Sequence, residues 1–99
     1  MIMSLRDKMQ KEIMSWKGVK ENPNRFGTPS FFVNDKEFAH FHNDSQMDIR
    51  IAKNLQNKLK DKKILPNPYS KSWILFNFKN EEDAKEALKF VKAVYDELK

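Results

Sequence analysis

The fold is decided by residues 31–42, which read FFVNDKEFAHFH. Two apolar runs flank Asn34-Asp35-Lys36, and both Asn and Asp tolerate the left-handed backbone that a tight turn needs. The pattern therefore predicts a β-hairpin whose two-residue turn is Asn34-Asp35. Because side chains alternate along a strand, this register predicts two faces. Phe31, Val33, Phe38, His40 and His42 would share one face, and Phe32, Ala39 and Phe41 the other.

The segments around the hairpin are predicted from the spacing of apolar residues and from turn formers. Residues 3–16 carry one apolar stripe at helical spacing, and Ser4 is placed to cap the helix that this stripe predicts. Residues 21–29 are rich in Pro, Asn and Gly, which predicts a loop. Residues 46–51 alternate between apolar and polar side chains, which predicts a third strand after the hairpin.

The second half of the chain adds two helices and a strand. A short helix is predicted over 52–63, a buried strand over 73–78, and a final helix that Asn80 caps. We expect one α+β domain over residues 1–99. Its sheet should be mainly antiparallel and four-stranded, with three helices, in the order helix-strand-strand-strand-helix-strand-helix.

The composition excludes several classes of site. The 99 residues include no cysteine, so disulfides, zinc–cysteine sites and thiol nucleophiles are excluded. Gly18 and Gly27 are the only glycines, and no phosphate-binding loop can be built from them. No apolar run approaches the ~20 residues of a membrane span, and the first residues lack a cleavable signal pattern. We expect a cytoplasmic protein with no membrane partner.

The net charge of +5 is concentrated in residues 50–79, which carry eight basic side chains and one acidic side chain. A lysine-rich face would suit nucleic acid, but a solvated helix end is the alternative, because no aromatic residue is interleaved to stack bases. An AT-rich genome also produces Lys- and Asn-rich chains, so nucleic acid is not an expected partner. The lysines concerned are Lys53, Lys58, Lys60, Lys62, Lys63 and Lys71.

His40 and His42 are the only histidines, and one residue separates them on the predicted strand. Both imidazoles should therefore face the same side. Asp44 and Asp48 follow closely, and a carboxylate beside an imidazole orients it for proton transfer. The pattern predicts His40, His42 and Asp44 as catalytic candidates, with the carboxylate of Asp44 or Asp48 near one ring. For Asp44, a purely structural role in the turn is the alternative.

The same residues are candidates for a divalent metal site. Two histidines and one carboxylate suit iron, manganese or zinc, so His40, His42 and Asp44 are the predicted ligands. The alternative is a pair of histidines hydrogen-bonded to their neighbours on the sheet. Arg25 in the Arg-Phe-Gly loop, Asp48 and Trp73 are predicted to bind a ligand. Arg25 would contact an anionic group or anchor the loop, and Trp73 would form an apolar wall.

These motifs together resemble the small luciferase-domain family of largely uncharacterised proteins, over about residues 16–96. Asn43 and Ser45 stand where the family has glycines, so the turn is expected to differ. The resemblance implies no established activity for small members. It rests on Arg25-Phe26-Gly27, residues 37–44, Asp48-Ile49, Ser72-Trp73, Glu82-Asp83-Ala84 and Tyr95.

Three functions are compatible with the sequence. The leading hypothesis is a domain that binds a polar small molecule in a pocket beside His40 and His42, and the sequence does not decide whether it is an enzyme. The second is a structural module that forms a homodimer through an apolar sheet face. Nucleic-acid binding is third. The predicted apolar face consists of Phe32, Phe41, Ile74, Phe76 and Phe78.

Overall fold

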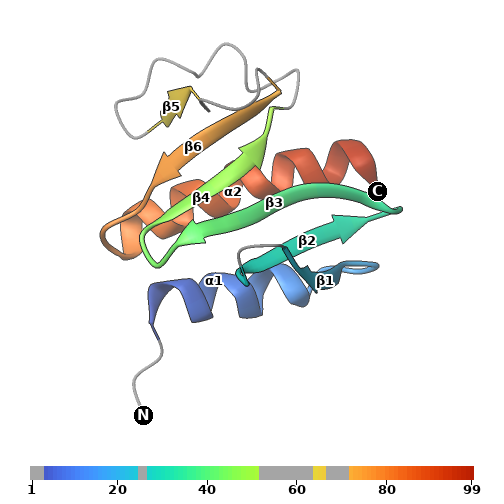
Figure 1. Ribbon diagram of the computed structural model, residues 1–99, viewed down its shortest axis with the longest axis horizontal. Helices are drawn as coiled ribbons and strands as arrows, with labels where there is room; N and C mark the ends of the chain where they lie inside the picture. Colours follow the sequence, from blue (N-terminus) through green and yellow to red (C-terminus); the bar gives the residue numbers. More distant parts are fainter. Residues whose placement is uncertain (1–3, 25–26, 52–63, 67–71) are drawn as a thin grey trace.

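One antiparallel sheet organises the protein, and the described residues contribute six strands in the order β1-β2-β3-β4-β6-β5. The computed structural model describes residues 4–24, 27–51, 64–66 and 72–99. Figure 1 shows β2, β3, β4 and β6 side by side, with α2 behind β3 and β4. The elements are α1 (Leu5–Met14), β1 (Lys20–Pro23), β2 (Pro29–Val33), β3 (Lys36–Asn43), β4 (Gln46–Arg50), β5 (Ile64–Pro66), β6 (Trp73–Asn77) and α2 (Glu81–Leu98).

The predicted α+β class and antiparallel sheet are confirmed, but the predicted count of four strands is wrong. β1 forms within a segment whose turn formers predicted a loop, because pairing with β2 satisfies its backbone groups. Pro23, which has no N–H to donate, ends this edge strand. β5 adds a short strand beyond β6. The helix predicted over 52–63 lies outside the described residues.

The predicted hairpin turn is confirmed. Asn34 and Asp35 have φ values of 51° and 64°, the left-handed backbone that the tight turns of β-hairpins require. Val33 pairs directly with Lys36 across the turn. Asn34 Nδ2 also donates to the carbonyl of Leu98, 2.8 Å away, which ties the turn to the end of α2.

The predicted shared face of Phe31, Val33 and Phe38 is confirmed, but the predicted faces of the residues after Phe38 are wrong because β3 contains a bulge. The register shifts after Phe32 pairs with Glu37, so that Phe31 faces Ala39 and Phe38 becomes the extra residue. Phe38, Ala39 and Phe41 are all buried, whereas His40 is only partly buried. The bulge therefore places Phe38 in the core and leaves the histidines on the opposite face of the sheet.

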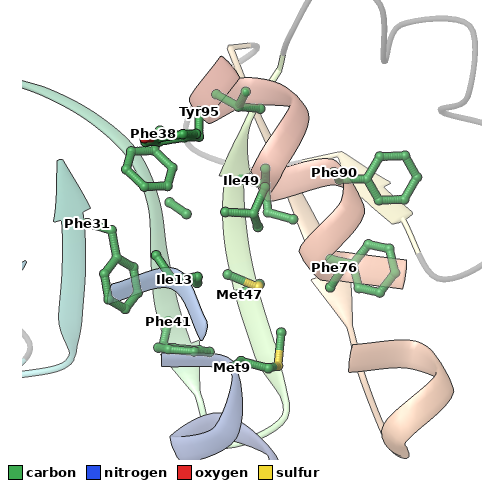
Figure 2. Close-up of a cluster of buried hydrophobic side chains, with 14 of the residues drawn as sticks. Met9, Ile13, Phe31, Phe38, Phe41, Met47, Ile49, Phe76, Phe90 and Tyr95 are labelled. Atoms are coloured by element: carbon green, nitrogen blue, oxygen red, sulfur yellow. The ribbon is translucent and has the colours of Figure 1, made fainter. Parts of the chain in front are cut away.

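The core lies between the sheet and the two helices. α1 contributes Met9 and Ile13, which are almost completely buried against the sheet. Figure 2 shows these side chains beside Phe31, Phe41 and Met47. The rings pack edge-on, as for Phe31 and Phe41, whose centroids are 5.8 Å apart at 80°. Both described helices therefore cover the same face.

Four of the five residues of the apolar face that suggested a homodimer are buried, and the fifth, Phe32, is partly buried. Phe41, Ile74, Phe76 and Phe78 are at most 2% exposed and belong to the core under the helices. Across the described part of the chain, Met14 is the only large apolar side chain classed as exposed. The homodimer hypothesis therefore loses the surface on which it rested.

The helix ends follow the predicted capping. Ser4 Oγ accepts the backbone N–H of Asp7 at 3.1 Å, and Asn80 Oδ1 accepts that of Asp83 at 2.9 Å. Lys8 Nζ donates to Glu81 Oε1 at 2.9 Å and joins α1 to α2. This hydrogen bond lowers the pKa of the Glu81 carboxyl. Neither described helix is long and apolar enough to cross a membrane.

Candidate functional site

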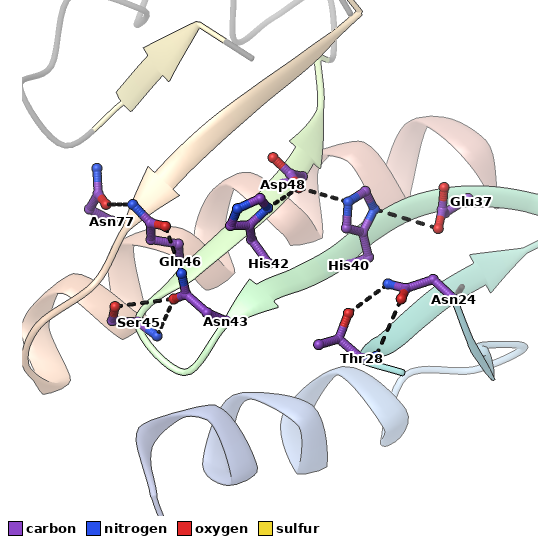
Figure 3. A network of polar contacts seen from close by, with 10 residues as sticks. All are labelled: Asn24, Thr28, Glu37, His40, His42, Asn43, Ser45, Gln46, Asp48 and Asn77. Atoms are coloured by element: carbon purple, nitrogen blue, oxygen red, sulfur yellow. Dashed lines mark hydrogen bonds and ion pairs between the residues drawn. The ribbon is translucent and has the colours of Figure 1, made fainter. Parts of the chain in front are cut away.

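His40 and Asp48 form the centre of a polar cluster on the sheet face opposite the helices. They are direct partners in the β3–β4 ladder, so their side chains lie on one face. His40 Nε2 is 2.7 Å from Asp48 Oδ2, a distance at which a neutral imidazole donates its Nε2–H to the carboxylate. The Asp48 side chain is only 6% exposed. Figure 3 shows both imidazoles directed toward Asp48.

His42 is the second imidazole that faces Asp48. The register shifts between Phe41 and Asn43, so that His42 is the extra residue beside the β3–β4 turn. Its Nδ1 is 3.6 Å from Asp48 Oδ2, which is slightly longer than a hydrogen bond. Its side chain is 49% exposed, against 25% for His40. His42 is therefore the more solvent-accessible of the two imidazoles.

Asn43 holds the turn that carries His42. Its Oδ1 accepts the backbone N–H of Ser45 at 2.9 Å and the Ser45 hydroxyl at 3.2 Å. Its Nδ2 donates to Gln46 Oε1 at 2.8 Å, and Gln46 Nε2 donates to Asn77 Oδ1 at 2.6 Å. These side-chain bonds stabilise one geometry of the turn.

Two further side chains, Glu37 and Trp73, lie beside His40, and Arg50 lies on the same sheet face. Glu37 Oε2 lies 3.5 Å from His40 Nδ1. The Trp73 ring packs against His40 with centroids 5.1 Å apart at 45°. Arg50 Nη1 donates to the backbone carbonyl of Glu37 at 3.3 Å. The cluster thus combines two carboxylates, two imidazoles, one guanidinium and an aromatic wall.

The predicted geometry of the histidines is confirmed, and the carboxylate that they face is that of Asp48. Asp44 occupies the tip of the turn, and its carboxylate lies 2.9 Å from Arg6 Nη1 of α1. The Asp44 side chain is 88% exposed. The structure thus does not bring Asp44 to the imidazoles. Trp73 lies beside His40 as expected, and Arg25 lies outside the described residues.

Sequence reasoning missed Glu37, Arg50 and Ser30 as parts of this face. Arg50 is two residues after Asp48 on the same strand, so alternation alone indicates its face. Glu37 reaches His40 only because the bulge at Phe38 intervenes, and no local signal predicts that bulge. Ser30 pairs with His40 across β2 and β3, which becomes visible only once the register is known.

The described cluster is organised by hydrogen bonding. Among the described residues, no group of three or more His, Cys, Asp or Glu side chains is arranged to hold a metal ion. His40 Nε2, one of the predicted ligand atoms, already faces Asp48 at 2.7 Å. A carboxylate between two imidazoles can fix ring orientation and stabilise a proton on either ring.

Comparison with known proteins places this site within a family. The family model for the luciferase domain matches residues 35–94, well over half of the chain. The chain belongs to the luciferase-domain family. The matched segment runs from the hairpin turn into α2 and contains Glu37, His40, His42, Asp48 and Trp73. No curated protein and no solved structure matches this luciferase-domain chain.

Proposed function

We propose that this luciferase-domain protein binds a polar small molecule on the open face of its sheet, beside His42. The observation that carries the proposal is the nearly buried Asp48 carboxylate, with an imidazole directed at it from each side. Burying a charge is costly unless hydrogen bonds compensate, so such an arrangement is stabilised by a specific set of partners. Solubility alone does not require a nearly buried carboxylate between two imidazoles.

His42 is proposed as the residue that contacts the ligand. With Nδ1 turned toward Asp48, its other ring nitrogen, Nε2, lies on the opposite edge of a half-exposed ring. In the neutral ring that donates through Nδ1, Nε2 is a hydrogen-bond acceptor. When the ring is protonated, Nε2 becomes a donor and Asp48 stabilises the cation. The same group therefore serves either binding or general acid–base chemistry.

His40, Asp48 and Trp73 are proposed as the residues that position His42 and shape the site. Trp73 packs on His40 and limits the rotation of its ring. His40 in turn holds Oδ2 of Asp48 at 2.7 Å. Rigid support of this kind fixes the geometry that a functional group needs. Arg25 lies outside the described residues, and its contact with an anionic group of the ligand remains a proposal.

The proposal is tested by an NMR screen against a library of small carboxylic acids, amines, polyols and nucleosides. We expect at least one compound to shift the ring signals of His42 and the indole signal of Trp73. His42→Ala should weaken that binding about tenfold or more, since a hydrogen bond to a charged group contributes about 1.5–3 kcal/mol. Asp44→Asn is the matched control and should leave the affinity unchanged.

Two results of the screen would contradict the proposal. One is binding that shifts only residues of the helices. The other is binding at the sheet face that His42→Ala leaves unaffected.

No described contact favours the two other functions. The apolar face behind the homodimer hypothesis is buried, and the six lysines behind the nucleic-acid hypothesis lie outside the described residues. Cytoplasmic localisation likewise stays a prediction.

A further inference from the structure

Ser30 is a buried residue beside the polar cluster that the site described above does not use. Its side chain lies in β2, directly opposite His40, so both side chains lie on the same sheet face. The residue is 1% exposed, and its hydroxyl has no hydrogen-bond partner among the described residues. A buried hydroxyl in a folded protein normally has such a partner.

His40 Nδ1 is a second polar atom without a hydrogen bond among the described residues. When Nε2–H donates to Asp48, Nδ1 of the neutral ring is an acceptor. The group nearest to it, Glu37 Oε2 at 3.5 Å, is also an acceptor and cannot satisfy it. Two neighbouring buried atoms on one sheet face therefore lack partners.

The two atoms are complementary to a single O–H group placed between them. The Ser30 hydroxyl donates, and His40 Nδ1 accepts. Ser30 and His40 are direct cross-strand partners, so one oxygen that forms hydrogen bonds of about 2.8 Å to both side chains would join them across the two strands. That oxygen would accept from Ser30 and donate to His40.

We propose that Ser30 and His40 form a subsite for a hydroxyl oxygen, supplied by water in the free protein and by the ligand's own hydroxyl group in the complex. The ligand class is thus a small alcohol or polyol, and this part of the inference rests on the proposed function. Glu37 Oε2 lies 3.5 Å from His40 Nδ1, so the carboxylate of this partly exposed side chain is placed to accept the second hydrogen of a bound water.

The change in melting temperature of Ser30→Ala distinguishes a subsite that holds a bridging oxygen from one that holds none. If an oxygen bridges the two atoms, removing the hydroxyl breaks a hydrogen bond and should lower the melting temperature by about 4–8 °C. It should also shift the ¹⁵N resonance of His40 Nδ1. Ser45→Ala is the control: its exposed hydroxyl bonds to Asn43, and water can replace that bond, so this variant should lower the melting temperature less and leave the His40 resonance in place. An unchanged or raised melting temperature in Ser30→Ala would overturn the proposal, because removal of an unpartnered buried hydroxyl relieves its desolvation cost.

Two crystal structures identify the source of the oxygen. Crystals grown without additives should show a water oxygen within about 3.2 Å of both Ser30 Oγ and His40 Nδ1. In crystals soaked with 1,2-ethanediol, either the same water or a diol hydroxyl at that point would support the subsite. A diol hydroxyl would also show that a ligand can supply the bridging oxygen. If neither crystal showed an oxygen between Ser30 Oγ and His40 Nδ1, the proposed subsite would be refuted. A bridging water alongside a failed ligand screen would reject only the proposed function.

Discussion

Phe38→Ala should lower the free energy of unfolding by about 3–5 kcal/mol, the usual range for loss of a buried phenylalanine ring. Phe38 is fully buried. Its ring centroid lies 6.0 Å from that of Tyr95 in α2 and 6.5 Å from that of Phe31 in β2. It is also the extra residue of the β3 bulge, so its loss leaves a cavity where the hairpin meets the helix. The stability of a domain of this size is about 5–15 kcal/mol, of which this is a large part.

Phe32→Ala is the matched control, because Phe32 is a phenylalanine of the same hairpin that is only partly buried. Urea melts of both variants should show the larger loss for Phe38. His42→Ala should change stability by about 0.5 kcal/mol or less, as at other exposed sites. His40→Ala should lower the free energy of unfolding by about 1–3 kcal/mol, between the losses for His42→Ala and Phe38→Ala, because it removes a hydrogen-bond partner of the buried Asp48. Equal losses for Phe38→Ala and Phe32→Ala would contradict the placement of Phe38 in the core.

Asp48→Asn should weaken binding of any compound found by the screen about 10- to 100-fold, while the protein stays folded. The amide has nearly the same shape as the carboxylate and still accepts a hydrogen bond from His40, so the ladder between β3 and β4 is kept. It lacks the negative charge that orients His42 and stabilises its protonated form. The loss should therefore appear in binding much more than in stability.

Calorimetric titration with the screened compound, together with a thermal melt, measures both quantities for Asp48→Asn. Asp44→Asn serves as the control and should leave binding unchanged, since it makes the same substitution at an exposed carboxylate that lies 2.9 Å from Arg6 Nη1. If Asp48→Asn bound the compound as tightly as the natural protein, Asp48 would be a structural residue and the proposed function would fail.

Local chemistry predicted the turns, the caps and the shared direction of the histidines. Asn34 and Asp35 favour the left-handed backbone on their own, and Asn80 caps α2 through a residue only three positions away. His40 and His42 share a face because they are two residues apart on one strand. Each of these features depends on neighbours in the sequence, so the sequence alone contains the signal.

Features that depend on pairing between distant segments were not predictable in the same way. The bulge at Phe38 reverses the predicted faces of the β3 residues that follow it, and it allows Phe38, Ala39 and Phe41 all to be buried under the helices. The choice of Asp48 over Asp44 follows from the β3–β4 register, which places Asp48 opposite His40. Asp44 instead meets Arg6, a residue of α1 that sequence spacing does not bring near it.

A long-range ¹H–¹⁵N spectrum of the imidazoles tests most directly whether Asp48 orients both rings. It should be recorded at a pH where both rings are neutral, for the natural protein and for Asp48→Ala. In the natural protein we expect the proton on Nε2 of His40 and on Nδ1 of His42, the two atoms that face Asp48 Oδ2. In Asp48→Ala both tautomers should lose this preference. A His40 proton on Nδ1 in the natural protein, or identical spectra for the two proteins, would contradict the proposed site.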